Sequence, residues 1–259
     1  MINVKGGFLK AEQVYNRSKC NGIFTSQALA EILSSPNFTE LLEATKRGVD
    51  NLGQPDPVLT KVLQEIGFTA LPIMVDSNHY QLLVKSGLTP VYRGVKRDNA
   101  IVDFATNPEL FVGKGLLCNG VHFVYDDGTK SSYGNTPLEM AARYARKPPK
   151  GLHKKIDADM QHYNEGQIVR ALISENAKAI EIKELLKLAK MVTESIKSNN
   201  TISESTKQKM IKLFSKEASV IAALEGIDVI VAERTRFLIG LNRGVFIMDK
   251  GMVDAELNK

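Results

Sequence analysis

Hydrophobic and polar positions follow one pattern up to residue 87 and another pattern after it. The first part carries stretches of helical spacing that begin at a capping residue. A capping box opens at Asn37, Asp56 precedes a proline that starts PVLTKVLQEI, and Asp76 precedes SNHYQLLVKS. We therefore expect residues 1–87 to form a helical N-terminal region.

From residue 88 onward, strand-like runs alternate with short helical stretches. The predicted strands are 89–95, 120–126, 167–174, 179–182, 227–233 and one or two within 237–249. The predicted helices are 99–106, 137–147, 183–197 and a long one over 205–226. Thr136 and Glu139 have the spacing of a capping box at the start of the second of these helices. The order predicts an α/β or α+β protein in which residues 88–259 form a domain built on a mixed sheet.

Composition limits the class of protein. The chain has 259 residues, 43% of them hydrophobic and 24% charged, which is typical of a folded protein. Cys20 and Cys118 are too few for a disulfide framework, and they favour a reducing cytoplasm. No apolar run is long enough for a membrane helix or a signal peptide, and the four histidines lack metal-ligand spacing. We therefore expect a cytoplasmic protein without a membrane partner and without a metal.

The net charge of +5 is a mild bias toward anionic partners. Residues 146–155, RKPPKGLHKK, are the most basic stretch and could contact RNA or DNA through phosphates, or an acidic protein. Most other lysines are spread over predicted helices, where solvated helix faces are the alternative explanation.

The strand PVYRGV carries the first candidate for chemistry. Arg93 can offer a planar fork to a phosphate or a ribose hydroxyl, and Gly94 leaves space for a ligand to reach the backbone. Tyr92 precedes them and adds an aromatic ring. An arginine at a strand end that pairs with a carboxylate is the alternative interpretation.

Several segments in order resemble the ADP-ribosyltransferase family, which includes NAD-using toxins and enzymes similar to poly(ADP-ribose) polymerases. The segments are VYRGV (91–95), GKGLLCNGVHF (113–123), PLEMAARYA (137–145), IVRALISENAKAIEI (168–182) and GIDVIVAERTRFLIGLNRGVFIM (226–248). The resemblance covers roughly residues 70–250. It implies an α+β fold with a split mixed β-sheet and NAD as the cosubstrate.

The resemblance also assigns roles to residues. It implies that Arg93 holds the ribose or phosphate side of NAD and that the backbone of Gly94 holds the nicotinamide amide. His122 and Phe123 fall on the strand that lines the nicotinamide site, and Tyr144 falls where a helix tyrosine stacks on the nicotinamide ring. His122 as a core histidine and Tyr144 as a helix-packing residue are the alternatives.

One feature of the family pattern is changed in this chain. The family places a glutamate just before a late strand, where it stabilises the oxocarbenium-like transition state. Here Arg236 holds that position and Glu233 is the nearest acid, so Glu233, reaching in from the loop, is the candidate catalytic carboxylate. A different register of the resemblance and a site that works without the acid are the alternatives. Asn242 could offer a hydrogen bond to a ribose hydroxyl, and a strand-turn residue is the alternative.

The resemblance therefore implies a mono-ADP-ribosyltransferase, a toxin or a bacterial or phage effector, with Arg93, Tyr144 and Glu233 as its catalytic residues. It would cleave NAD at the nicotinamide–ribose bond and transfer ADP-ribose to a nucleic acid or a protein. The alternative is an inactive module of the same fold that binds a nucleotide or a partner protein. The N-terminal region could serve as a docking or neutralisation surface for another protein.

Overall fold

The structure, a computed structural model, describes residues 2–21, 71–95, 100–106, 113–114, 119–129, 135–146, 166–216 and 218–258. Within these ranges it contains a ten-stranded mixed sheet. The strands are β1 (Phe8–Leu9), β2 (Ile73–Val75), β3 (Pro90–Val95), β4 (Gly113–Lys114), β5 (Asn119–Tyr125), β6 (Gln167–Ile173), β7 (Ala179–Glu181), β8 (Val229–Ala232), β9 (Phe237–Gly240) and β10 (Phe246–Asp249). The predicted mixture of helices and strands is confirmed.

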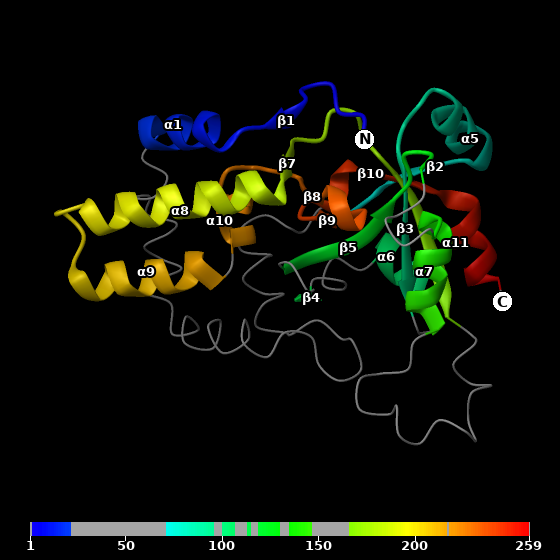
Figure 1. Ribbon diagram of the computed structural model, residues 1–259. Coiled ribbons are helices and arrows are strands. Elements are labelled where there is room, and N and C mark those ends of the chain that lie inside the picture. The colour runs from blue at the N-terminus through cyan, green and yellow to red at the C-terminus, as the bar shows by residue number, and fades with distance from the viewer. Residues whose placement is uncertain are drawn as a thin grey trace, which may run out of the picture.

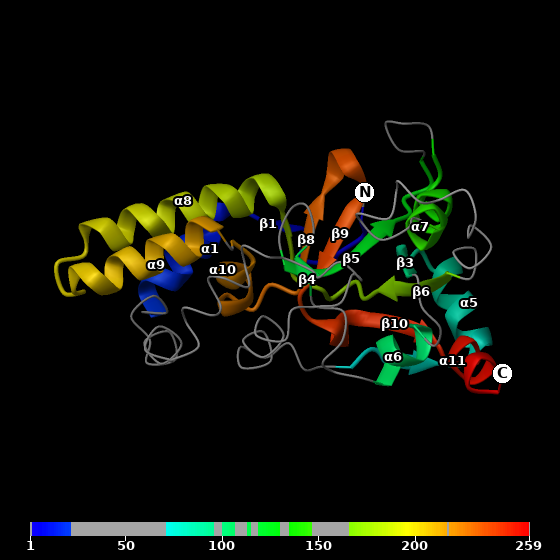
Figure 2. The ribbon, with the colours of Figure 1, turned by 90° about the horizontal axis from the view of Figure 1, so that it is seen from below.

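The helices fall into two groups beside this sheet (Figures 1 and 2). One group consists of α1 (Ala11–Asn21), α8 (Ile182–Ser198), α9 (Glu204–Lys216) and α10 (Ala218–Leu224). The other consists of α5 (Ser77–Lys85), α6 (Ala100–Thr106), α7 (Pro137–Arg146) and α11 (Lys250–Leu257). Two 3₁₀ turns, η3 (Glu233–Thr235) and η4 (Arg243–Val245), precede β9 and β10 respectively. Among the described residues, no helix combines the length and apolar character needed to cross a membrane.

The strand order is β1-β7-β8-β9-β5-β3-β6-β10-β2, and β4 pairs with β5 outside this path. The pairs β1–β7, β7–β8 and β10–β2 are parallel, and the other pairs are antiparallel. The sequence did not predict β1 or β2, which are short and lie at the two ends of the sheet. The described part of the N-terminal region therefore contributes to the same sheet as residues 88–259.

Two apolar clusters form the core. In the first, α1, α8, α9 and α10 pack on β7, β8 and β9 around Leu185, Phe214, Val220 and Ile230. The second contains side chains of β3, β5, β6 and β10 with α6 and α11, and its centre is a contact between the rings of Phe104, Phe123 and Phe246.

Local signals in the sequence place several helix ends correctly. Asp76 accepts a hydrogen bond from His79 N at 2.8 Å and caps α5. Thr136 and Glu139 form the expected reciprocal box at α7, with Thr136 N to Glu139 Oε2 at 2.7 Å and Glu139 N to Thr136 Oγ1 at 3.2 Å. The helices predicted to begin near Asn37 and Asp56 lie outside the described residues.

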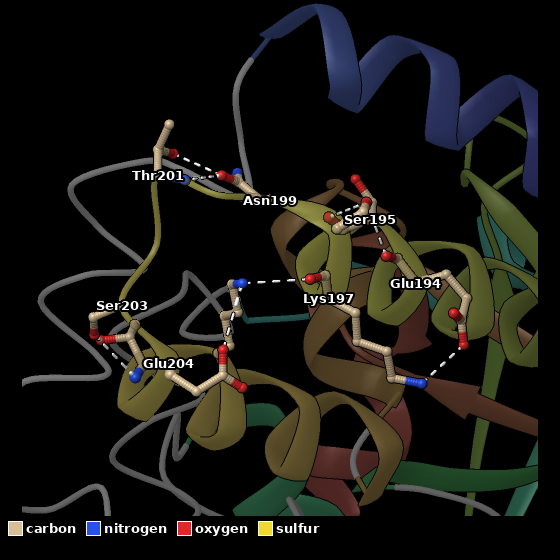
Figure 3. Close-up of polar contacts among 10 residues, drawn as sticks. Glu194, Ser195, Lys197, Asn199, Thr201, Ser203 and Glu204 are labelled. Carbon is tan, nitrogen blue, oxygen red and sulfur yellow. Dashed lines mark hydrogen bonds and ion pairs between the residues drawn. The ribbon is translucent and has the colours of Figure 1, made fainter.

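The connection between α8 and α9 is closed by short-range polar contacts (Figure 3). Asn199 Oδ1 accepts from Thr201 N at 2.8 Å and from Thr201 Oγ1 at 2.7 Å, and Lys197 pairs with Glu194 at 3.0 Å. This turn places α9 alongside α8. The single long helix predicted over 205–226 is wrong, because the structure has two helices there and both pack against α8.

Candidate functional site

The ladder between β3 and β5 covers only two residue pairs, Val91 with Tyr125 and Tyr92 with Val124. Beyond them, β3 stays paired with β6 as far as Val95, and β5 stays paired with β9 as far as Val121. Each of the two central strands therefore keeps its outer partner while their mutual pairing stops. We call the segments that follow, Arg93–Gly94 and His122–Phe123, the ladder end.

Arg93 bridges the two strands at the ladder end. Its Nη1 donates a hydrogen bond to the main-chain carbonyl of His122 at 3.1 Å. A carbonyl at this place would accept from a neighbouring main-chain N–H if the ladder continued. The guanidinium supplies a donor instead and places a cation between two strands at the middle of the sheet.

The ring of His122 is held close to its own strand. Its Nδ1 lies 3.1 Å from the carbonyl oxygen of Gly120, while Nε2 is buried and has no hydrogen-bond partner among the described residues. Burial, with a smaller contribution from the positive charge of Arg93, lowers the pKa of His122 to about 4. The imidazole is therefore neutral at pH 7, and a proton on Nδ1 leaves Nε2 as an acceptor.

Gly94 has a different role from the one expected. A Cβ at this position would lie 1.9 Å from the carbonyl oxygen of Ala141 and 2.5 Å from the amide nitrogen of Ala145, both in α7. The expectation that this glycine leaves space for a ligand is therefore corrected, because the backbone of α7 fills the space. Gly166 has the same relation to Ala145, where a Cβ would lie 2.3 Å from the carbonyl oxygen. The two glycines allow α7 to pack directly on the sheet.

Tyr144 is on α7, and 42% of its surface is exposed. Its ring contacts the ring of Phe237 edge to face, with centroids 5.9 Å apart and an interplanar angle of 62°. Phe237 begins β9 and is paired across the sheet with Val124 of β5. The helix thus carries this ring to Phe237, on the face of the sheet that Val124 and Tyr92 share. The role of Tyr144 in stacking on nicotinamide stays a prediction.

The side chain at position 236 is turned away from these rings. Arg236 has a left-handed backbone (φ 59°), pairs with Asp127, donates to Thr129 and lies 5.6 Å above the ring of Tyr125. Burial by itself raises the pKa of Asp127, but the hydrogen bonds that its carboxylate accepts, including those from Thr129 and Arg236, outweigh burial and hold that pKa well below its usual value. Arg236 is therefore neutralised locally by a carboxylate.

Glu233 lies in η3, and its side chain is partly exposed. Its charge contributes to raising the pKa of Tyr125, which burial raises most, so Glu233 lies near the Tyr125 end of β5. Tyr125 and His122 are separated by three residues of strand, or about 10 Å. The structure thus places the candidate carboxylate toward the other end of β5 from His122.

Three further candidates are engaged elsewhere or face away from Arg93. Phe123 is 1% exposed and belongs to the aromatic core with Phe104. Asn242 donates to Asp228 Oδ1 at 2.9 Å and accepts from Gly244 N at 2.9 Å, so both polar atoms of its amide serve the turn before β10. Tyr92 alternates with Arg93 along β3 and therefore presents its side chain to the opposite face.

Sequence reasoning missed two polar residues on that opposite face. Arg170 interrupts the apolar run of β6 and lies directly opposite Tyr92. Tyr80 of α5 is 5% exposed, and burial, followed by the neighbouring Tyr92, raises its pKa to about 12. An arginine inside an otherwise apolar strand was the available signal for the first, and no signal in the sequence pointed to the second.

Comparison of the chain with models of protein families, with curated proteins and with solved structures gave no match in any of the three. Within the described ranges, no group of three or more His, Cys, Asp or Glu side chains could hold a metal ion.

Proposed function

We propose that this protein binds NAD at the ladder end and transfers ADP-ribose from it to a macromolecular acceptor. The observation that carries the proposal is the contact between Arg93 and the His122 carbonyl, where the ladder between two central strands stops. Two motifs that are 29 residues apart in sequence, YRG and GVHF, meet there. A resemblance between unrelated sequences would not require these two motifs to meet.

Each residue has a definite task in this proposal. Arg93 is a fixed cation that favours the pyrophosphate or ribose side of NAD. His122 stays neutral, so it does not repel the positively charged nicotinamide ring, and its buried Nε2 can accept a hydrogen bond. Tyr144, held beside Phe237, offers an exposed aromatic face for the leaving nicotinamide.

Cleavage of the bond from ribose C1′ to the nicotinamide nitrogen leaves positive charge on the ribose, which an adjacent carboxylate stabilises. Glu233 remains the candidate for this task, since it is partly exposed on the turn that leads into β9. Arg236 does not add an uncompensated positive charge there, because Asp127 pairs with it.

Thermal unfolding tests NAD binding. We expect 1 mM NAD to raise the melting temperature of the protein and Arg93→Ala to abolish the shift, because a ligand that binds only the folded state stabilises it. Lys190→Ala, which removes an exposed cation of α8, is the matched control and should keep the shift. A parent protein whose melting temperature does not respond to NAD contradicts the proposal.

A non-catalytic module of the same fold is the second candidate function. It is favoured by one observation: the position expected for the catalytic carboxylate holds Arg236, and Asp127 fixes that side chain in place. A nicotinamide-release assay separates the two functions. Release that is lost in both Arg93→Ala and Glu233→Ala supports the transferase, while NAD binding without release supports the module.

The acceptor is proposed to be an anionic macromolecule, because the chain carries a net charge of +5 and a basic segment at 146–155. Of this segment only Arg146 lies within the described residues. Incubation of a lysate with labelled NAD, followed by nuclease or protease treatment, identifies the acceptor as nucleic acid or protein. Label in neither fraction would leave hydrolysis of NAD as the reaction.

A further inference from the structure

A row of directly opposed residues crosses four neighbouring strands on one face of the sheet. Phe237 of β9 lies opposite Val124 of β5, and Val124 lies opposite Tyr92 of β3. Tyr92 in turn lies opposite Arg170 of β6. Directly opposed side chains point to the same face with Cβ atoms about 5 Å apart. Tyr92 and Arg170 are therefore immediate neighbours on this face.

Tyr80 of α5 adds a third polar side chain to this pair. It is 5% exposed. Burial raises its pKa most, Tyr92 raises it further to about 12, and the positive charge of Arg170 opposes this rise. The position of α5 agrees with this: Ser77 Oγ at its start donates to Asp249 Oδ1 of β10 at 2.8 Å, and β10 is the strand beside β6. The cluster therefore combines residues from a helix and two strands, with α7 packed at the Gly94 end of the same strand pair (Figure 1).

All three side chains have hydrogen-bonding groups that the protein leaves unused. Among the described residues, neither the hydroxyls of Tyr80 and Tyr92 nor the guanidinium of Arg170 makes a hydrogen bond or an ion pair. The Tyr80 hydroxyl is not one of the buried polar atoms that lack a partner, so it keeps access to solvent and to a ligand. A guanidinium on an exposed residue beside two such hydroxyls suits an external ligand rather than the core.

The chemistry of the three groups selects the ligand. Burial raises the pKa of Tyr92, and the charge of Asp126 raises it further. The pKa of Tyr80 is raised as well, so both phenols keep their protons at neutral pH and can donate hydrogen bonds. A guanidinium with two phenolic donors matches an oxyanion with several acceptor oxygens. Phosphoryl oxygens fit this set, since arginine binds them through paired N–H groups.

Two carboxylates lie at the sides of the cluster, Asp126 near Tyr92 and Asp249 near Tyr80. Both are engaged elsewhere. Asp126 accepts from Gly128 N at 2.9 Å, and Asp249 accepts from Ser77 Oγ at 2.8 Å and from Gly251 N at 2.9 Å. Their negative charge weakens the binding of an anion and would strengthen the binding of a cation. Neutralising one of them therefore shows whether the ligand is negatively or positively charged.

We propose that Arg170, Tyr92 and Tyr80 form a binding site for a phosphoryl group. Arg93 is not part of this site, because alternation along β3 directs Tyr92 and Arg93 to opposite faces. Tyr144 and Phe237 lie on the Tyr92 face, beyond Val124 from the cluster. The site does not depend on NAD binding. Its source of phosphoryl groups is inorganic phosphate, a mononucleotide or the backbone of a nucleic acid, and the row of Tyr92, Val124 and Phe237 offers apolar contact to a base.

Isothermal titration calorimetry of the full chain tests this site with inorganic phosphate, uridine monophosphate, uridine and a ten-residue oligouridine. We expect the monophosphate to bind and uridine to bind at least about 10-fold more weakly, because uridine lacks the charged group. Binding of the oligouridine much tighter than the monophosphate identifies a strand as the source. Equal affinity of phosphate and monophosphate identifies the free anion.

Three variants test the residues. Arg170→Gln should weaken monophosphate binding at least about 10-fold and Tyr80→Phe, which keeps the ring, about fivefold. Asp126→Asn, whose amide oxygen can still accept from Gly128, should tighten binding. Lys190→Gln removes the same charge as Arg170→Gln from an exposed site on α8 and should have little effect.

The proposal is overturned by the absence of saturable binding of phosphate or monophosphate up to about 10 mM, or by equal affinity in the parent and in Arg170→Gln. Weaker binding in Asp126→Asn also overturns it, because that result indicates a cationic ligand. NAD is measured in parallel. Arg93→Ala should abolish the NAD-induced shift in melting temperature and keep monophosphate binding. Arg170→Gln should keep the NAD-induced shift and weaken monophosphate binding. The two proposals can therefore be contradicted independently.

Discussion

The guanidinium of Arg93 donates to the main-chain carbonyl of His122 at 3.1 Å, in the place where β3 and β5 cease to pair. A side chain there replaces a rung of the ladder. The strands can separate at this point without leaving that carbonyl unsatisfied, which would be costly for a buried polar group. The same contact gives the proposed NAD site its cation.

Gly94→Ala should destabilise the fold strongly. The new Cβ would overlap the main chain of α7 at Ala141 and Ala145, so the helix must move away from the sheet. We expect a loss of about 2 to 4 kcal/mol in the free energy of unfolding, measured by urea titration. Gly6→Ala is the control, because nothing lies within 4 Å of its Cβ position. Equal stability of the two variants would show that α7 does not pack on Gly94.

His122 should make the protein less stable in mild acid. Its pKa is lowered from 6.5 to about 4 in the folded state, so the unfolded chain binds the proton more readily. The free energy of unfolding therefore has its full value above about pH 7, where the ring is neutral in both states, and it falls as the pH drops from about 6.5 toward 4. Between pH 8 and pH 5 the parent should lose about 2 kcal/mol more than His122→Gln, which does not titrate.

Urea titrations of both proteins over this range measure the difference. An NMR titration of the His122 ring gives an independent value for the pKa. A midpoint near 6.5 in the folded protein would contradict the buried, neutral ring.

Asp127→Asn should remove the ion pair with Arg236 and the local order at the start of β9. We expect a loss of about 1 to 3 kcal/mol at pH 7, typical of a hydrogen-bonded charged group that is largely buried. Because the folded pKa of Asp127 is depressed, its stabilising effect is present above about pH 4 and disappears as the pH falls through the depressed value. The difference between parent and variant should therefore be constant from pH 7 to about 4 and shrink below that.

Denaturant titrations at several pH values test this dependence. Asp254→Asn, at an exposed position of α11, is the matched control and should change stability little. A stability difference for Asp127→Asn that grows below pH 4 would contradict the assignment.

Arg243 should tolerate a long apolar side chain better than a short one. It is 2% exposed, donates to the carbonyl of Phe104 at 3.1 Å and lies 5.8 Å from the centre of that ring. Burial lowers the pKa of Arg243 to about 10, which shows that the charge is poorly solvated. Arg243→Met removes this charge and keeps most of the volume, so we expect a change within about 1 kcal/mol, against a loss of about 3 kcal/mol for Arg243→Ala. Thermal and urea unfolding of both variants measure this, and equal losses would show that the charge itself is needed.

The local elements near the site were predictable because their signals lie within a few residues. The capping box of Thr136 and Glu139 fixed the start of the helix that carries Tyr144, and the apolar spacing of residues 89–95 and 120–126 predicted β3 and β5. The division of residues 205–226 into α9 and α10 was missed, since both segments have helical spacing.

The contacts between these elements were not predictable in the same way. The sequence predicted a ligand space at Gly94, and the structure fills it with α7. It also presented Arg236 as a charge in the site, whereas the fold pairs it with Asp127, 109 residues away. No local pattern encodes such a pair, because it depends on which strands are neighbours.

The sequence by itself determined the elements, their caps and the side of each strand on which a residue lies, because these follow from spacing and from hydrogen bonds between near neighbours. Tertiary structure decided the strand order, and with it the meeting of Arg93 with His122 and of Tyr92 with Arg170. A side-chain period of two residues tells which face a residue occupies and leaves open which strand lies beside it. That choice is made by the burial of the whole sheet between its helices.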